Sequence, residues 1–544
     1  MTHELTAVEN FSLQQDLRQI AEGRKVYKEL IPKTTPGPGQ QYAFEVNLDQ
    51  CSGCKACVAA CHSENGLDED ETWRSVGLLQ GGGDENPTIQ HITSACHHCL
   101  EPACMSGCPT KAYEKDPTTG IVKHLDDQCF GCQYCILKCP YDVPKYNPKR
   151  GIVHKCDMCI SRLNVGEAPA CVRACPTSAI RITVIDQQKV RNRPQDFVNI
   201  PEAPDSRYTL PTTRYVSRQS LPSDMTSIDS YTVKPEHSHL PLVFMLVLTQ
   251  LSVGSFGVEL FLREYAPSSL STLLFPFSVG MALGMGLLAL AASVLHLGRP
   301  LYAFRAFLGF QTSWLSREIV AFGTFALLAA FYASALWVVP LRNKILSLGG
   351  GAGLTVLAIS VFVSGFLGVL CSVMVYRDTQ RPFWNHPITS WKFLMTTMIL
   401  GVVNVLMASV VFSWMGSVIS PTYIMETFGK DFCRVLIAAM AIKLLMEASI
   451  FSHLCQKKMT FFKKSALLMT RPLKRITQLR FFLGVAGGMI LPAVFLNDSA
   501  MLPEEMKVMF AVAIFIFCLG GEILERYLFF RAVVPLKMPG GQAS

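Results

Sequence analysis

Apolar residues are distributed unevenly along the 544-residue chain. Up to residue 236 they occur in short runs between polar and cysteine-rich stretches, whereas long apolar segments follow residue 240. The approximate limits of eight such segments are 240–261, 272–295, 319–339, 352–375, 391–414, 432–454, 481–496 and 506–530. Each approaches or exceeds the ~20 residues that a helix needs to cross the hydrocarbon layer, and the seventh is the shortest. The pattern therefore predicts a soluble first part followed by an all-α transmembrane bundle of eight helices.

The soluble part divides further by composition. Scattered apolar residues over 10–31, followed by a run rich in Pro and Gly, predict an N-terminal extension over 1–40 that contains a short helix. Between 41 and 190, short β-like runs alternate with groups of cysteines, which indicates a small α+β, ferredoxin-like domain wrapped around inorganic clusters. The stretch 191–239 is rich in Pro, Ser, Thr, Asp and Arg and predicts a linker arm before the membrane domain over 240–536.

The formal net charge is +8, and the basic residues of the second half lie in loops between the apolar segments. This placement favours a role in membrane topology over nucleic-acid binding. With eight crossings, loops on the side of the soluble domain hold seventeen Lys and Arg residues, and loops on the opposite side hold six. The positive-inside rule therefore predicts a multi-pass protein of a prokaryotic cytoplasmic membrane, with the cysteine-rich domain on the cytoplasmic side.

Sixteen of the twenty cysteines fall between residues 51 and 175. No apolar h-region and no twin-arginine pair is visible in residues 1–40, so we expect reduced thiolates that bind metal rather than disulfides. The sixteen form four groups: Cys51, Cys54, Cys57 and Cys61; Cys96, Cys99, Cys104 and Cys108; Cys129, Cys132, Cys135 and Cys139; Cys156, Cys159, Cys171 and Cys175. A proline follows each of the last three groups.

The spacing C-x2-C-x2-C-x3-C-P is that of bacterial ferredoxins, in which three close cysteines bind one cluster and the fourth binds another. Paired C-x2-C units also make zinc sites, but zinc does not account for the third cysteine or for the trailing proline. The sequence therefore predicts four [4Fe–4S] clusters bound by all sixteen cysteines. The other four cysteines are isolated in or near membrane helices and are predicted to be packing residues; they are Cys371, Cys433, Cys455 and Cys518.

The groups, their order and the eleven-residue insertion in the fourth group resemble the iron–sulfur subunit of the dimethyl sulfoxide reductase family of molybdopterin complexes. In that family the first and fourth groups exchange their last cysteines, as do the second and third. The resemblance therefore implies four ligand sets: Cys51, Cys54, Cys57 and Cys175; Cys156, Cys159, Cys171 and Cys61; Cys96, Cys99, Cys104 and Cys139; Cys129, Cys132, Cys135 and Cys108. It also implies that the clusters form a wire for single electrons.

The second half resembles the eight-helix membrane anchor subunit of the same family. The stretches HLGRP at 296–300, SWLSRE at 313–318 and GEILERY at 521–527 carry this resemblance. The better-known members have two polypeptides, whereas here the two parts are fused. The resemblance implies a non-catalytic electron-transfer subunit that oxidises menaquinol from the membrane quinone pool. Its electrons would pass to a separate molybdopterin-containing catalytic subunit that reduces a substrate such as dimethyl sulfoxide.

Quinol oxidation releases two protons with two electrons, so the membrane domain needs a proton acceptor. His296 ends the second apolar segment and Glu318 begins the third, and both helix ends lie on the side of the soluble domain. An imidazole and a carboxylate suit this task, and we expect these two residues at the quinol site. The alternative is structural: His296 caps a helix, and Glu318 pairs with Arg317 or Arg299 at the membrane surface.

Further ionisable residues lie within the apolar segments, namely Glu259, Lys443, Glu447, Glu522 and Glu525. Lys443 and Glu447 are four residues apart and are expected to neutralise each other on one helix face. Glu522 is a candidate for a proton path. Haem b is not expected, because apart from His296 only His453 lies in a predicted membrane helix.

Three other functions remain open at this stage. Electrons could run the other way, from a formate-, sulfur- or hydrogen-oxidising partner into quinone, and measured cluster potentials would distinguish the two directions. A redox-driven ion pump would need paired charges or broken helices near mid-membrane, and the apolar segments show few. A passive scaffold would only anchor a catalytic partner.

Overall fold

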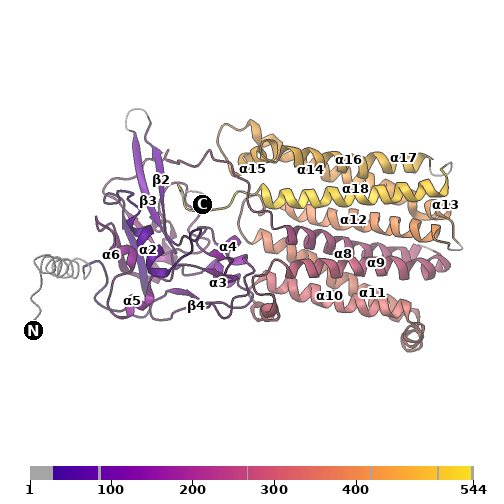
Figure 1. Cartoon of the computed structure of the whole chain (residues 1–544), viewed down its shortest axis with the longest axis horizontal. Helices are drawn as coiled ribbons and strands as arrows, with labels where there is room; N and C mark the ends of the chain where they lie inside the picture. Colours follow the sequence, from indigo (N-terminus) through magenta and orange to yellow (C-terminus); the bar gives the residue numbers. More distant parts are fainter. Residues whose placement is uncertain (1–28, 84–86, 266, 417–418, 499–501, 541–544) are drawn as a thin grey trace, which may run out of the picture. The chain divides into compact units, whose positions relative to one another are not determined.

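The computed structural model describes residues 29–83, 87–265, 267–416, 419–498 and 502–540. The chain forms two compact units, Met1–Thr232 with Pro535–Ser544 and Val233–Val534. We call the first the head and the second the membrane unit (Figure 1). Most of the helix predicted for 10–31 lies outside the described residues.

The first sheet of the head joins distant parts of the sequence. Its central strand β1 (Gln40–Asn47) pairs antiparallel with β8 (Ile180–Asp186) and parallel with β9 (Arg214–Val216). The residues of β1 from Gln41 to Val46 are all buried, so both faces of this strand are covered. The sheet thus ties the beginning of the cysteine-rich region to its end.

A second sheet and two hairpins complete the β-structure. β2 (Ser75–Gly81) lies between β3 (Thr88–Ser94) and β10 (Thr226–Ser227). The hairpins are β4 (Tyr113–Lys115) with β5 (Val122–His124) and β6 (Lys145–Asn147) with β7 (Ile152–His154). The helices are short: α2 (Ala56–Asn65), α3 (Ala103–Ser106), α4 (Tyr134–Lys138), α5 (Ile160–Asn164), α6 (Ala170–Arg173) and α7 (Gln187–Asn192). These short elements around cysteine loops form the α+β domain that the sequence predicts.

The stretch 191–239 is not the open linker arm that its composition predicts. Up to Thr232 it belongs to the head, where β9 and β10 each add a strand to a sheet. Phe197, Val198 and Tyr215 are buried among the head's apolar residues. Burial of a few aromatic and aliphatic side chains is enough to fix a polar segment in place. Average composition therefore misassigned this stretch.

The last described residues return to the head. Met538 is buried in the head's core. The N–H of Gly540 donates a hydrogen bond to the Ser227 hydroxyl, and a Cβ on Gly540 would lie 2.1 Å from the backbone nitrogen of Leu78. Only glycine fits here, because its φ is +68° and there is no space for a side chain. The membrane unit therefore ends at Val534, two residues before the predicted limit.

The described part of the membrane unit contains eight spans that are long and apolar enough to cross a bilayer. This number agrees with the eight apolar segments. The spans are built from α8 (Leu240–Tyr265), α9 (Ser268–Val294), α10 (Trp314–Trp337), α11 (Val339–Arg377), α12 (Pro387–Trp414), α13 (Pro421–Ile424) with η3 (Met425–Gly429) and α14 (Lys430–Ala448), α16 (Lys474–Val485) with η5 (Ala486–Ile490) and α17 (Leu491–Asp498), and α18 (Glu504–Arg531). Between spans lie η2 (Pro300–Gly309), η4 (Ser449–Cys455) and α15 (Phe461–Thr470).

The spans pack in two sets that meet at α8 and α12. Helices α8 to α11 form one set, and α12, α14, α16 and α18 form the other (Figure 1). At the junction a Cβ on Gly254 of α8 would lie 1.9 Å from the carbonyl oxygen of Thr397 on α12. Small residues allow this close approach of two membrane helices.

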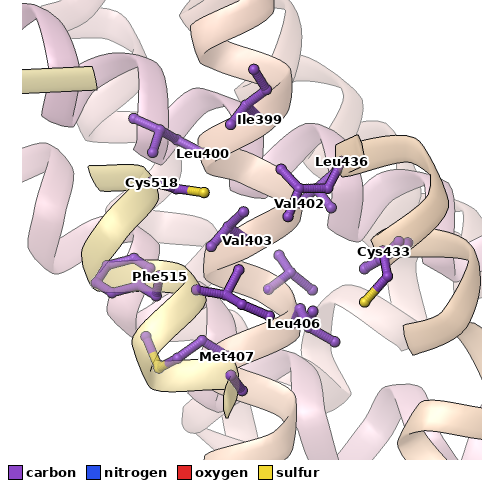
Figure 2. Packing of buried hydrophobic residues seen from close by; sticks show 14 of the residues in the cluster. Ile399, Leu400, Val402, Val403, Leu406, Met407, Cys433, Leu436, Phe515 and Cys518 are labelled. Atoms are coloured by element: carbon purple, nitrogen blue, oxygen red, sulfur yellow. The ribbon is translucent and has the colours of Figure 1, made fainter. Parts of the chain in front are cut away.

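The second set surrounds an apolar core, shown in Figure 2. Val403 and Leu406 of α12 are buried between Leu436 of α14 and Phe515 of α18. Cys433 and Cys518 point into the same core and are fully buried, as expected of packing residues. Cys371 is only half-buried and Cys455 is exposed. The packing prediction therefore fits two of the four isolated cysteines.

Candidate functional site

The structure brings cysteines from different parts of the head sequence together. All sixteen are free of disulfide bonds. Electrostatic interactions between thiolates link Cys175 to Cys51, and Cys61 to Cys159 and Cys171. Cysteines of the first and fourth groups therefore lie near one another, as the predicted exchange of last cysteines requires. That these cysteines bind iron stays a prediction.

Cysteines of the second and third groups also lie near one another, as the predicted exchange requires. Cys139 interacts electrostatically with Cys96, Cys99 and Cys104, and Cys108 interacts with Cys132 and Cys135. Interactions also run between the four sets that result, for example between Cys156 and Cys96 and between Cys61 and Cys57. These sets are therefore neighbours, an arrangement that suits electron transfer from one to the next.

Two kinds of loop shape these groups. Lys55 and Gln133 follow the second cysteine of their groups, and both adopt a left-handed φ of 61° that starts the helix carrying the third cysteine. The sequences Cys108-Pro-Thr-Lys-Ala and Cys175-Pro-Thr-Ser-Ala form a matching pair after the last cysteine. In each, the alanine N–H donates to the cysteine sulfur, at 3.2 Å in the first loop and 3.3 Å in the second. Such N–H···S bonds stabilise a thiolate and tune the potential of a bound cluster.

Two buried cations lie among the sulfurs. Arg74 is 2% exposed and interacts electrostatically with Cys171, Cys57, Cys156 and Cys61. Lys155 interacts with Cys96, Cys104 and Cys156, and donates hydrogen bonds to the carbonyl oxygens of Val122 and Cys156. Burial lowers the pKa of both cations, but the surrounding thiolates outweigh burial and raise it. Both side chains therefore remain charged and offset part of the negative charge of the thiolates.

The donor set fits iron–sulfur clusters. Burial raises the pKa of the Cys61 thiol to about 12 and that of Cys159 to about 11, so an uncompensated thiolate is unfavourable at these positions. Iron bound to sulfur would supply the missing positive charge. Among the described residues, no three His, Cys, Asp or Glu side chains are close enough to hold a single metal ion.

In the membrane unit, Glu318 lies in the second turn of α10 and is 4% exposed. The Ser372 hydroxyl of α11 donates a hydrogen bond to Glu318 Oε1. The Arg317 guanidinium donates instead to the carbonyl oxygens of Phe310 and Gln311. Arg317 is therefore not the ion-pair partner of Glu318. A buried carboxylate with a single hydroxyl partner in a membrane helix is a functional candidate rather than a surface ion pair.

His296 follows the end of α9, and its ring contacts that of His239 with centroids 5.1 Å apart. The His239 ring in turn contacts Phe530 of α18, at 5.8 Å. Burial and the neighbouring histidines and Arg381 lower the pKa of His239 to about 3, so this imidazole is neutral at pH 7. His296 is thus held by ring contacts beside a neutral base. His239 was missed in the sequence because it precedes the first apolar segment.

Tyr376 links these groups and was also missed. It lies one helical turn after Ser372 on α11, and its hydroxyl is within electrostatic reach of both Glu318 and Arg526. Its ring contacts Phe530 at 5.5 Å. In the sequence, Tyr376 is marked only by a serine four residues earlier at the end of an apolar segment. This pattern is too common to identify a functional site.

The second set of helices contains an ionic network that corrects one prediction. Lys443 does not neutralise Glu447; it bonds to Glu522 of α18, whereas Glu447 accepts from Arg480 Nε at 3.0 Å and Nη2 at 2.8 Å. Arg480 Nη2 also donates to Glu522 at 3.0 Å. Long-range pairing prevails because the neighbouring helices supply partners for both charges. The network supplies paired charges of the kind that are scarce in the apolar segments of the sequence, and the π-helical turn η5 lies in the same span as Arg480.

Comparisons with known proteins agree with this division. Residues 235–531 match the family described as DMSO reductase anchor subunit, and residues 88–185 match a 4Fe-4S dicluster domain. A subunit of the anaerobic dimethyl sulfoxide reductase of Haemophilus influenzae is 34% identical over 181 residues, which cover 32% of this chain and 87% of that protein. The subunit of the same name from Escherichia coli is 33% identical over 179 residues, covering 31% of this chain and 86% of the relative.

A formate dehydrogenase iron–sulfur subunit of H. influenzae is 34% identical over 162 residues, covering 27% of this chain and 52% of the relative. The similarity of the head is therefore shared by subunits of two kinds of complex. The anchor match covers more than half of the chain. The chain belongs to the dimethyl sulfoxide reductase anchor subunit family, with an iron–sulfur domain similar to a second reductase subunit fused ahead of the anchor.

Proposed function

We propose that this chain oxidises menaquinol in its membrane unit and passes the electrons through four [4Fe–4S] clusters to a separate molybdopterin-containing catalytic subunit. The observation that supports the proposal is the proximity of cysteines from different groups of the sequence. Each bound cluster would accept and release one electron at a time. The sixteen cysteines would hold these clusters, and Arg74 and Lys155 would offset their negative charge.

The quinol site is proposed at Glu318 and His296. Glu318 is buried and oriented by Ser372, and His296 is held against His239. The two side chains supply two proton acceptors for the two protons that quinol loses. They lie near the ends of α10 and α9 that share a side with the start of α8, so the protons would be released on the side from which the chain enters the membrane unit.

The excess of Lys and Arg in loops on the side of the soluble domain supports the predicted cytoplasmic location of the head. Both connections of the membrane unit lead to the head, at Thr232 and at Pro535. The anchor family supports reduction of a dimethyl sulfoxide-like substrate by the partner. The formate dehydrogenase relative favours a second candidate, in which the same clusters deliver electrons to quinone.

The test uses the full chain purified anaerobically with its co-purifying large subunit. We expect about sixteen irons per chain, four for each cluster, and cluster reduction by a menaquinol analogue. Glu318→Gln and His296→Gln should lose this reduction while dithionite still reduces every cluster. Quinol-driven reduction that persists in both variants would refute the site. Cluster potentials far below that of menaquinone would favour the reverse direction.

The ionic network makes an ion pump a further candidate to be tested. The proposed function releases quinol protons on the cytoplasmic side, where the electrons are also consumed, so turnover in sealed vesicles should separate no charge. Acidification that collapses with an uncoupler, and is lost in Lys443→Met, would instead assign ion transport to the second set of helices.

A further inference from the structure

Tyr376 combines a fixed ring with a free hydroxyl. It is 4% exposed, and its ring is held edge-on by Trp384 at 5.2 Å, Phe529 at 5.2 Å and Phe530 at 5.5 Å. In the described part of the chain its hydroxyl makes no hydrogen bond. A buried phenol usually finds a partner. The ring contacts fix the position of the Tyr376 hydroxyl. Packing of the ring does not itself require a hydroxyl group there.

Arg526 contacts two aromatic rings that Tyr376 also contacts. Its guanidinium stacks on Phe393 with 3.8 Å to the ring centroid and lies 5.2 Å from the centroid of Phe529. Tyr376 contacts both of these rings as well. Arg526 is fully buried and donates one hydrogen bond, from Nη2 to Gln250 Oε1 at 3.3 Å. Its Nε and Nη1 are buried without a hydrogen-bond partner.

These groups are donors, and the Glu318 carboxylate lies within electrostatic reach of the Tyr376 hydroxyl. The Tyr376 hydroxyl interacts electrostatically with Glu318 and with Arg526, which come from two other helices. The Arg526 charge is partly offset by Glu525, whose Oε2 lies 3.6 Å from Nη2 in poor hydrogen-bonding geometry. Leaving the buried Arg526 Nε and Nη1 donors unsatisfied in a membrane helix bundle is costly. A ligand with an acceptor oxygen would satisfy them.

We propose that Tyr376 and Arg526 form the second half of the quinol site, binding the quinol oxygen that is not held by Glu318. This inference rests on the proposed function and adds to it the polar groups that hold the far oxygen. Tyr376 donates a hydrogen bond to that oxygen. Arg526 is always protonated, so it cannot accept a proton and stabilises negative charge instead. The occupant is a lipid-soluble para-quinol, because two oxygens on opposite sides of a ring match a carboxylate on one side and donors on the other.

The chemistry balances with these roles. Quinol loses two O–H protons and two electrons to become quinone. One proton goes to the Glu318 carboxylate and the other to the His296 imidazole, while the electrons leave singly to two oxidised iron–sulfur clusters. When a proton leaves before the second electron, negative charge resides on the ring oxygen. A buried guanidinium next to this oxygen lowers the energy of that state.

The experiment uses the full chain with its large subunit and a water-soluble menaquinol analogue. The variants are Tyr376→Phe, Arg526→Gln and Arg526→Lys. The controls are Tyr423→Phe and Arg434→Gln, whose side chains are exposed and lie away from Glu318. Measured quantities are KM and kcat for quinol, activity with reduced viologen, and the paramagnetic signal of the one-electron-oxidised quinone during a redox titration.

Tyr376→Phe should raise KM about tenfold with little change in kcat, as expected for one lost hydrogen bond. Arg526→Gln should lower both kcat and the quinone radical signal at least about tenfold, and Arg526→Lys should restore part of each. Viologen activity should not change. Control-like KM, kcat and radical signal in Tyr376→Phe and Arg526→Gln would overturn the inference.

Two further outcomes keep the test decisive. Tyr376→Phe removes a single atom, so it decides the matter if Arg526→Gln does not fold. Glu318→Gln, measured in parallel, separates the two proposals. If Glu318→Gln abolishes quinol oxidation and Tyr376→Phe behaves like Tyr423→Phe, the quinol site stands and its second half does not. If Glu318→Gln and His296→Gln both remain active, the proposed quinol site itself fails.

Discussion

Ser372 on α11 donates its hydroxyl hydrogen bond to the Glu318 carboxylate on α10. In the described part of the chain, this is the one hydrogen bond that orients the carboxylate. Helices α10 and α11 are adjacent and extensively packed, and the alternative acceptor for the Ser372 hydroxyl is the carbonyl oxygen of Gly368 at 3.2 Å. Glu318 is thus oriented before any ligand arrives.

Ser372→Ala should slow quinol oxidation about tenfold, because a hydrogen bond to a charged group is worth ~1.5–3 kcal/mol and its loss leaves the carboxylate free to rotate. The measurement is the quinol-driven rate divided by the viologen-driven rate of the same preparation. Ser364→Ala, on the same helix with its hydroxyl bonded to a backbone carbonyl, is the control. Equal ratios in the two variants would show that Ser372 does not orient Glu318.

Lys443→Met should destabilise the membrane unit by ~3–5 kcal/mol, because it leaves Glu522 buried with only Arg480 to balance two carboxylates. The double variant Lys443→Met with Glu522→Gln should recover part of this loss, since it removes both charges. Thermal unfolding in detergent measures both effects. Arg434→Gln, which breaks an exposed pair with Asp431, should change stability by less than ~1 kcal/mol.

Cys61→Ser and Cys171→Ser should remove the same cluster, although the two residues lie in different groups of the sequence. Each variant should lose about four of sixteen irons and the same low-temperature paramagnetic signal. Cys175→Ser should share its lost signal with Cys51→Ser instead. Loss of the same signal in Cys61→Ser and Cys51→Ser would contradict the exchange of last cysteines.

The stability of the protein should fall as the pH drops below about 6.5, and His239 should account for part of the fall. Its pKa is lowered from 6.5 to about 3 by burial and by nearby positive groups. Between these values the unfolded chain binds a proton that the folded chain does not, so the stabilisation is complete above pH 6.5 and is lost toward pH 3. Comparison of unfolding at pH 7.5 and 5.5 should show a loss of roughly 1.4 kcal/mol.

His239→Asn should remove this loss, and asparagine tolerates the φ of +44° at this position. An identical pH dependence in wild type and His239→Asn would show that His239 becomes protonated in the folded protein.

Gly540→Ala should destabilise the head by ~1–3 kcal/mol, because a Cβ there meets the backbone of β2. Gly39→Ala is the matched control: its φ is +76°, but a Cβ there has no neighbour within 4 Å. The difference between the two variants in thermal unfolding isolates the steric part. A Gly540→Ala protein as stable as Gly39→Ala would indicate that the C-terminal segment leaves the head in solution.

The sequence predicted those features that depend on local pattern. Apolar runs long enough to cross a bilayer as helices identified the spans. The cysteine spacing identified the loops that carry three cysteines each. Contacts between residues far apart in the sequence were harder to predict. The pairing of Lys443 with Glu522 instead of Glu447 depends on which helices are neighbours, and so does the proximity of Tyr376 to Glu318 and Arg526. The folding of 191–232 onto the head likewise depends on a few apolar side chains whose partners lie far away along the chain.

The return of Met538 to the core of the head has a consequence for biogenesis. The ribosome synthesises this residue only after all eight spans have been made, since the membrane unit interrupts the sequence of the head. The hydrophobic core of the head therefore stays incomplete until the last helix has left the ribosome. The electron-carrying domain can therefore complete its fold only after the anchor has been synthesised.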